Sequence, residues 1–165
     1  MAEHETSQVL ITTLNHLLTE KNQLCAVAES CTGGLISAAI TAYPGSSAWF
    51  DCGFVTYSNH AKHLLLGVPQ QTLDRFGAVS KETAQAMAEG ALQHSQADVS
   101  VSVTGIAGPS GGSPNKPVGT IWFAWASKLR PTQIAQHHLQ GARADIRQQA
   151  VIIALQGLLE QAQQA

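Results

Sequence analysis

Two adjacent side chains, Ser30 and Cys31, are candidate nucleophiles in a segment whose composition is typical of a turn between a strand and a helix. The segment Glu29-Ser30-Cys31-Thr32-Gly33-Gly34 follows a short apolar run at residues 24–28. At such a turn the unpaired N–H groups of the helix can stabilise an anion or a tetrahedral oxyanion, and glycine lets a ligand approach the backbone. The segment therefore predicts nucleophilic chemistry by Ser30 or Cys31. The alternative is that Ser30 or Thr32 only caps the helix.

Lys62 is the candidate base for a serine nucleophile, since the sequence has no obvious Ser/His/Asp signature. It ends the segment Tyr57-Ser58-Asn59-His60-Ala61-Lys62, which follows a predicted strand. A buried lysine can be neutral near pH 7 and accept a proton, and a tyrosine at a strand end can relay that proton. The alternative is a solvated helix lysine and a core tyrosine, and periodicity alone does not decide between the two.

Two arginines and a glycine-rich segment are candidates for holding an anionic group. Arg143 and Arg147 are one helical turn apart at the start of a predicted helix, so one helix face could bind a phosphate or a carboxylate. Ordinary surface arginines with Asp145 between them are the alternative. The segment Gly105-Ile106-Ala107-Gly108-Pro109 follows a predicted strand end, where open α/β sheets bind ligands.

The sequence lacks the signatures of a metal site and of common nucleotide folds. His60 and His63, like His137 and His138, have no cysteine or carboxylate at a spacing that completes a metal set. Neither the G-x-G-x-x-G nor the G-x-x-x-x-G-K-[ST] pattern occurs, which argues against ordinary dinucleotide-binding and P-loop folds. No metal site is predicted.

The elements that must position these groups alternate between helix and strand. Apolar periodicity and capping residues predict helices at residues 7–21, 35–40, 59–66, 81–95 and 143–163. Aromatic, β-branched and short apolar runs predict strands at residues 24–28, 49–57, 99–104, 120–127 and 133–139. The interleaving, with a strand-to-strand connection at Pro131, favours a layered α/β fold with a mixed sheet.

Two of these segments carry particular expectations. Residues 99–104 alternate valine with serine or threonine, which predicts one polar face unless the hydroxyls satisfy one another. Residues 105–119 hold five glycines and three prolines, which predicts a loop, and their low charge argues against a disordered linker.

Composition and charge exclude several classes of protein. The 165 residues fit one domain at residues 1–165, and 44% hydrophobic with 12% charged residues is a poor match to a disordered chain or a coiled coil. The net charge is −2 with scattered basic residues, so nucleic acid is not an expected partner. No apolar stretch approaches the roughly 18 residues that span a bilayer, the acidic start lacks a signal peptide's basic region, and the three cysteines form no C-x-x-C pair. We therefore expect a cytoplasmic protein without a membrane partner.

Six segments, in order along the chain, resemble the CinA C-terminal domain family. They are Ala28-Glu29-Ser30-Cys31-Thr32-Gly33-Gly34, Gly45-Ser46-Ser47-Ala48-Trp49-Phe50, Gly53-Phe54-Val55-Thr56-Tyr57-Ser58-Asn59, Gly77-Ala78-Val79-Ser80, Gly105-Ile106-Ala107-Gly108-Pro109 and Lys116-Pro117-Val118-Gly119-Thr120. The resemblance runs from about Val9 to the C-terminus. The family's enzymes are nicotinamide-nucleotide amidases, and this chain resembles their stand-alone version because it begins directly at the amidase-like part.

The resemblance implies a three-layer α/β/α sandwich with a mixed central sheet. It implies hydrolysis of the carboxamide of nicotinamide mononucleotide to nicotinate mononucleotide and ammonia, in pyridine-nucleotide salvage, with no metal or organic cofactor. The expected partners are this small molecule and a second copy of the chain, since the apolar faces of the terminal helices also favour a homodimer.

Carried over residue by residue, the family's serine is Ser30, its tyrosine is Tyr57 and its lysine is Lys62. Thr104 and Arg143 match family positions near the substrate, although relatives often have an acidic residue before this arginine where this chain has Gly141-Ala142. The predicted substrate contacts combine these two residues with residues of the turn, the loop and the second arginine. They are Cys31, Thr32, Gly33, Gly34, Thr104, Gly105, Arg143 and Arg147.

These assignments give a mechanistic hypothesis. Lys62, kept neutral by burial and acting directly or through Tyr57, deprotonates Ser30, which attacks the amide carbon while N–H groups at residues 31–33 stabilise the oxyanion. Ammonia leaves, water frees the acyl-enzyme, and the 5′-phosphate is held by Arg143 or by the loop at residues 105–108. The alternatives are a catalytically silent nucleotide-binding or regulatory module of the same fold, and a thiol amidase built on Cys31.

Overall fold

A computed structural model of the chain describes residues 2–164, in which helices and strands alternate along most of the sequence. The elements, in chain order, are α1 (Ala2–Glu20), β1 (Cys25–Glu29), α2 (Leu35–Thr41), the short 3-10 helix η1 (Ser46–Ala48), β2 (Phe50–Val55), α3 (Asn59–Leu66), α4 (Gln70–Phe76), α5 (Lys81–Gln93), β3 (Val99–Gly105), β4 (Thr120–Ser127), β5 (Arg130–His138) and α6 (Arg143–Gln164).

The five strands form one mixed sheet in the order β2-β1-β3-β4-β5. Strand β1 is parallel to both β2 and β3, with Glu29 opposite Val55 on one side and Val103 on the other. Strands β3, β4 and β5 pair antiparallel. The carboxyl ends of the three parallel strands therefore meet at one edge of the sheet, where open α/β sheets bind ligands.

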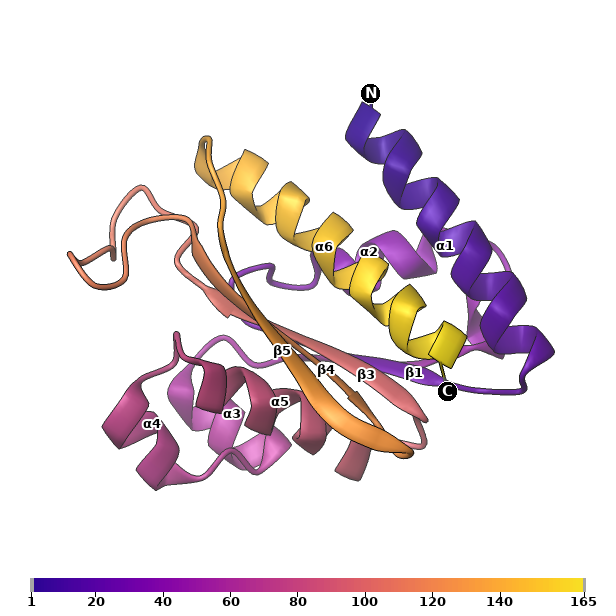
Figure 1. Cartoon of the computed structure of the whole chain (residues 1–165), viewed down its shortest axis with the longest axis horizontal. Helices are drawn as coiled ribbons and strands as arrows, with labels where there is room; N and C mark the ends of the chain where they lie inside the picture. Colours follow the sequence, from indigo (N-terminus) through magenta and orange to yellow (C-terminus); the bar gives the residue numbers. More distant parts are fainter. Residues whose placement is uncertain (1, 165) are drawn as a thin grey trace.

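Helices cover both faces of the sheet. Helices α1, α2 and α6 lie on one face and α3, α4 and α5 on the other (Figure 1). The predicted three-layer α/β/α sandwich is confirmed. The larger core lies under α1 and α6, where Leu14, Leu18 and Ala154 pack with buried valines of β3. This burial uses the apolar faces that the periodicity of the two terminal helices predicts.

Strand β3 is buried on both faces, so the predicted polar face is wrong. Val99, Val101 and Val103 belong to the core under α1 and α6. The hydroxyls of Ser100 and Ser102 donate to backbone carbonyls of α5, at 2.7 and 2.6 Å. The hydroxyls are therefore satisfied by helix carbonyls rather than by one another, and the buried strand carries little desolvation cost.

One helix was missed by the sequence prediction, and the connection between β4 and β5 lies elsewhere than predicted. Helix α4 was not predicted, because its seven residues include few apolar positions and only Leu73 is buried. Strand β5 begins at Arg130 and contains Pro131, so the connection from β4 lies at residues 128–129 rather than at the proline. Proline fits there because β5 is an edge strand, where a missing N–H breaks no ladder bond on the open side. No helix in residues 2–164 is both long and apolar enough to span a membrane.

Candidate active site

A cavity of about 270 Å³ lies at the carboxyl edge of the parallel strands. Its walls come from the ends of β1 and β3, the start of α3, the segment before α5, the glycine-rich loop and α6. The lining residues are Ser30, Cys31, Tyr57, Lys62, Ala78, Val79, Thr104, Gly105, Ile106, Ala107, Gly108, Ser110, Gly111 and Arg143. The cavity thus brings together all three residues that the resemblance implies are catalytic.

Ser30 and Lys62 are in direct contact. The Nζ of Lys62 donates a hydrogen bond to Ser30 Oγ at 2.9 Å and further bonds to the carbonyls of Thr56 at 2.9 Å and Tyr57 at 3.3 Å. The Lys62 side chain is 1% exposed. Burial lowers the pKa of Lys62 to about 8, an effect that Cys31 partly opposes. At pH 7 about one tenth of the amine is then neutral and able to take the proton of Ser30.

Local structure explains why a lysine is buried here. Ser58 caps α3 by accepting a hydrogen bond from the N–H of Ala61 at 3.0 Å, and Gly67 ends the helix with a φ of 67°. Lys62 and Leu66 are one turn apart and are the buried residues of this helix. The helix therefore directs Lys62 inward, on the same helix face as the buried Leu66.

Tyr57 does not lie between Lys62 and Ser30. Its side chain is 62% exposed, and its hydroxyl accepts a hydrogen bond from Nη2 of Arg143 at 3.2 Å. Only its backbone carbonyl contacts Lys62. The structure therefore favours direct proton transfer between Lys62 and Ser30 over a relay through the tyrosine hydroxyl, and Tyr57 lines the cavity instead.

A buried carboxylate shapes the turn after β1. Glu29 is 0% exposed, and its two oxygens accept hydrogen bonds from the N–H groups of Gly34, Ile36 and Ser37 and from the Ser37 hydroxyl, at 2.8–3.1 Å. No role was predicted for Glu29 from the sequence. The available signal was an acidic residue shortly before a helix start, where a carboxylate is favourable.

The turn itself is built on backbone conformation rather than on a side-chain cap. Gly33 and Gly34 have positive φ values of 58° and 99°, which other residues rarely adopt. The N-cap of α2 is Gly34, with no side-chain cap bond, so the alternative in which Ser30 or Thr32 caps the helix is wrong. Of the four turn residues expected to contact substrate, only Cys31 lines the cavity.

Cys31 is a poor nucleophile in this position. Its side chain is 6% exposed, and burial raises the pKa of the thiol to about 11 although the Lys62 and Arg147 charges act in the opposite direction. The thiol therefore stays protonated at neutral pH, and the thiolate is the reactive form of cysteine.

The two arginines of α6 have different surroundings. Arg143 lines the cavity, where its Nη1 donates to the carbonyl of Gly108 at 2.8 Å. Within residues 2–164 it forms no ion pair, because Asp145 instead accepts from the N–H of Ala142 at 2.8 Å. Arg147 lies behind the turn, and its Nε and Nη2 donate to the carbonyls of Cys31 and Thr32 at 3.1 and 2.9 Å. Arg147 therefore contacts the backbone of the turn and does not line the cavity, and its predicted substrate contact stays a prediction.

Residues 76–79 form a rim that sequence reasoning did not assign. Ala78 and Val79 line the cavity. The Thr104 hydroxyl donates to the Ala78 carbonyl at 2.8 Å, and Lys116 Nζ donates to the Phe76 carbonyl at 2.9 Å. Thr104 thus lines the cavity, and its hydroxyl holds the rim. The signal for this rim was the Gly77-Ala78-Val79-Ser80 motif.

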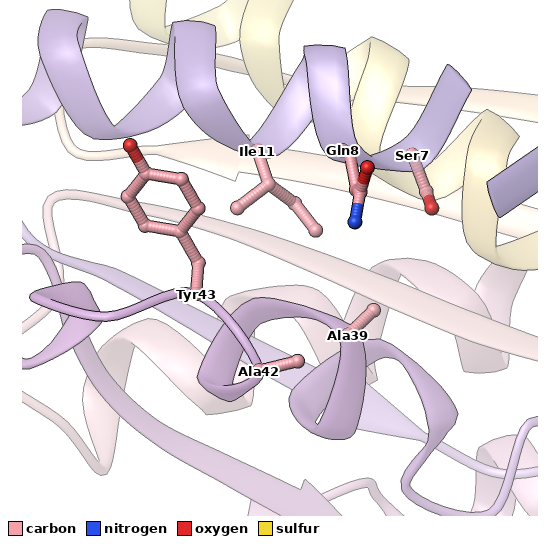
Figure 2. A pocket seen from close by; sticks show the side chains of 6 residues that line it. All are labelled: Ser7, Gln8, Ile11, Ala39, Ala42 and Tyr43. Atoms are coloured by element: carbon pink, nitrogen blue, oxygen red, sulfur yellow. The ribbon is translucent and has the colours of Figure 1, made fainter. Parts of the chain in front are cut away.

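Other candidate sites are poorer. Figure 2 shows a hollow of about 90 Å³ between α1 and α2, lined by Ser7, Gln8, Ile11, Ala39, Ala42 and Tyr43. These residues include no charged group and no nucleophile beside a base. In the described part of the chain, no three His, Cys, Asp or Glu side chains gather in a group that could hold a metal ion.

The fold and the site define a three-layer α/β/α protein with a serine and a buried lysine in contact at the sheet edge. The family model described as "CinA C-terminal domain" matches residues 7–162. The chain belongs to this family, so the resemblance seen in the sequence is confirmed.

Relatives match most of the chain. The nicotinamide-nucleotide amidohydrolase PncC of Enterobacter agglomerans is 56% identical over 134 residues, covering 81% of this chain and 82% of the relative. The protein of the same name from Pseudomonas putida is 50% identical over 151 residues, covering 92% of this chain and 94% of the relative. A CinA-like protein of Akkermansia muciniphila is 50% identical over 87% of this chain, which spans only 34% of that longer protein.

A solved structure has the same fold. The competence/damage inducible protein CihA from Agrobacterium tumefaciens superposes with a TM-score of 0.89 at 43% identity, covering 97% of this chain and 95% of that one.

Proposed function

We propose that this protein hydrolyses the carboxamide of nicotinamide mononucleotide to nicotinate mononucleotide and ammonia. The two relatives named nicotinamide-nucleotide amidohydrolase, at 56% and 50% identity over most of both chains, support an amide hydrolase acting on nicotinamide nucleotides. The observation that carries the serine mechanism is the 2.9 Å hydrogen bond between Lys62 Nζ and Ser30 Oγ in a buried setting.

The first step joins Ser30 to the substrate. Neutral Lys62 takes the proton of Ser30 as Oγ attacks the carboxamide carbon, and the carbonyl oxygen becomes an oxyanion. The N–H groups of Cys31 and Thr32 have no backbone acceptor within residues 2–164, and the Thr32 N–H belongs to the peptide unit that starts at the cavity residue Cys31. These two N–H groups stabilise that charge. Protonated Lys62 then gives its proton to the departing nitrogen, and ammonia leaves an ester of Ser30.

The second step releases the product. Water loses a proton to Lys62 as it attacks the ester carbon, and the proton returns to Ser30 Oγ as the ester bond breaks. The products are nicotinate mononucleotide and free enzyme, and no redox change or metal is involved in either step.

Arg143 and the glycine-rich loop form the proposed seat for the 5′-phosphate. The two were alternatives in the sequence analysis, but Arg143 Nη1 reaches the Gly108 carbonyl and both line the cavity. The N–H groups of Ala107 and Gly108 have no acceptor in the described part of the chain. A guanidinium without an ion pair, beside N–H groups without a backbone acceptor, suits a phosphate.

Several finer expectations stay predictions. A single-domain, cytoplasmic enzyme of pyridine-nucleotide salvage that needs no cofactor is expected from the sequence and the resemblance. The homodimer now depends on the resemblance alone, because the apolar faces of α1 and α6 pack inside the protomer. Light scattering tests the oligomeric state, and EDTA tests the absence of a metal requirement.

The deciding experiment is ammonia release from nicotinamide mononucleotide by wild type and Ser30→Ala, with EDTA present and free nicotinamide as a control substrate. We expect release by the wild type and a loss of at least about 1,000-fold in the variant, because the residual rate depends only on binding and the oxyanion donors. Near-normal turnover by Ser30→Ala would exclude the serine mechanism. Binding of a pyridine nucleotide without ammonia release by folded wild type would favour the silent binding module.

A further inference from the structure

The free N–H groups of the turn after β1 are few and adjacent. From Ser30 to Ser37, most backbone N–H groups already donate to protein acceptors: Ser30 to Val103, Gly33 to Ser30, Leu35 to Thr32, and Gly34, Ile36 and Ser37 to Glu29. Those of Cys31 and Thr32 have no backbone acceptor within residues 2–164. Because Glu29 occupies the N-terminus of α2, an oxyanion at Ser30 can meet only these two backbone donors in this segment.

Arg147 controls the direction of the Thr32 N–H. The C=O and N–H of a trans peptide point in opposite directions. Arg147 Nε donates to the carbonyl of Cys31 at 3.1 Å. This bond fixes the peptide between Cys31 and Thr32, so its N–H points away from Arg147.

Arg147 also controls the Cys31 N–H, through one intermediate bond. Its Nη2 donates to the carbonyl of Thr32 at 2.9 Å, which fixes the peptide between Thr32 and Gly33. The N–H of that peptide donates to the carbonyl of Ser30 at 3.1 Å. The Ser30 carbonyl in turn belongs to the peptide that carries the Cys31 N–H. Arg147 therefore sets both free donors, one directly and one through the turn.

We propose that Arg147 is a positioning residue for the oxyanion site: its guanidinium holds the two peptide units whose N–H groups stabilise the transition state. This inference rests on the proposed amide hydrolysis. A cation on the carbonyl side also polarises each peptide, which makes its N–H a stronger donor. Arg147 lines no part of the cavity, unlike Arg143 on the preceding turn, so it acts through the backbone and not on the substrate.

The test compares Arg147→Met with Arg147→Lys, and with Arg143→Met as the matched variant on the same helix. Donors that act on transition-state charge affect kcat, whereas a phosphate contact affects KM. We expect Arg147→Met to lower kcat by about 100-fold with little change in KM. Arg147→Lys keeps a charge but lacks the planar fork, so it restores only part of the rate. Arg143→Met should mainly raise KM.

Chemical rescue separates positioning from general damage to the fold. Added guanidinium at low concentration should restore part of the kcat of Arg147→Met and none of that of Ser30→Ala. An Arg147→Met variant that unfolds at the wild-type temperature and either keeps the wild-type kcat or shows only a raised KM would overturn the inference. The inference would also be overturned if the rate loss of Arg147→Met matched its loss of folded protein and Arg147→Lys were fully active.

A second readout does not depend on the substrate. A fluorophosphonate probe attaches to an activated serine and leaves a phosphoryl oxygen at the oxyanion position, and intact mass reports the rate of Ser30 labelling. We expect Arg147→Met to be labelled more slowly than wild type by a similar factor. If wild type hydrolysed no nicotinamide mononucleotide, the proposed function would fail and these rates would decide the role of Arg147. Equal labelling rates, or no labelling of wild type, would overturn that role.

Discussion

Replacing Lys62 by methionine should change how the stability of the protein depends on pH. Burial lowers the pKa of Lys62 from 10.5 to about 8. Between these values the unfolded chain binds more protons than the folded one, so the free energy of unfolding rises with pH in this window. Below pH 8 the folded state bears the full cost of the buried charge, and above 10.5 it bears none.

The size of the effect follows from the shift. A shift from 10.5 to about 8 corresponds to about 3 kcal/mol at 1.36 kcal/mol per pKa unit. Between pH 7 and pH 9.5, a range that is accessible to experiment, this shift should raise the free energy of unfolding by about 2 kcal/mol. Methionine has a similar length and no charge, so Lys62→Met removes this contribution while filling most of the same space.

The assay is urea unfolding followed by tryptophan fluorescence at several pH values. The difference in unfolding free energy between wild type and Lys62→Met should move in favour of wild type by about 2 kcal/mol from pH 7 to pH 9.5. Other titrating groups contribute equally to both proteins and cancel. Lys81→Met, at an exposed position, should show no such trend. A difference that stays constant over this range would refute the argument that Lys62 is desolvated.

Two further outcomes follow from the site. The value of kcat/KM should rise about tenfold per pH unit below pH 8 and level off above it, because only neutral Lys62 accepts the serine proton; a flat profile from pH 6 to pH 9 would contradict this role. Cys31→Ala should keep ammonia release within about threefold of wild type, because the thiol pKa is raised to about 11 and Lys62 contacts Ser30 instead. If Cys31→Ala lost as much ammonia release as Ser30→Ala, Cys31 would be the nucleophile instead of Ser30.

Local sequence signals predicted much of the fold. Helix α3 begins and ends as expected, at Asn59 and Leu66, because Ser58 supplies a cap and Gly67 a left-handed C-terminal residue. Helix α4 carries neither a side-chain cap nor a long apolar stripe, so its sequence differs little from a loop. In β5, the proline that suggested a break is tolerated only because the strand lies at the sheet edge, which depends on strand order.

The individual residues of the site could be predicted from the sequence, but the contacts between them could not. Ser30 and Lys62 were singled out by residue type and by the resemblance, but their contact joins two elements 32 positions apart. The two arginines of α6 have identical local signals, and only the packing of α6 against the turn separates their roles. Arg147 contacts backbone carbonyls, which leave no mark in the sequence, so only the tertiary structure reveals these contacts.

The buried carboxylate of Glu29 also sets the charge at the start of α2. It neutralises the positive end of α2 beside Ser30, whereas Arg143 on α6 has no carboxylate partner within residues 2–164. The N–H groups at the start of α2 are therefore already paired, whereas Arg143 in the cavity wall keeps a charge without an ion pair. For a reaction that turns an amide into a carboxylate, the new negative charge forms close to Glu29 rather than at an unneutralised helix end. A carboxylate product beside Ser30 therefore meets no unpaired helix N-terminus that would retain it, which favours its release.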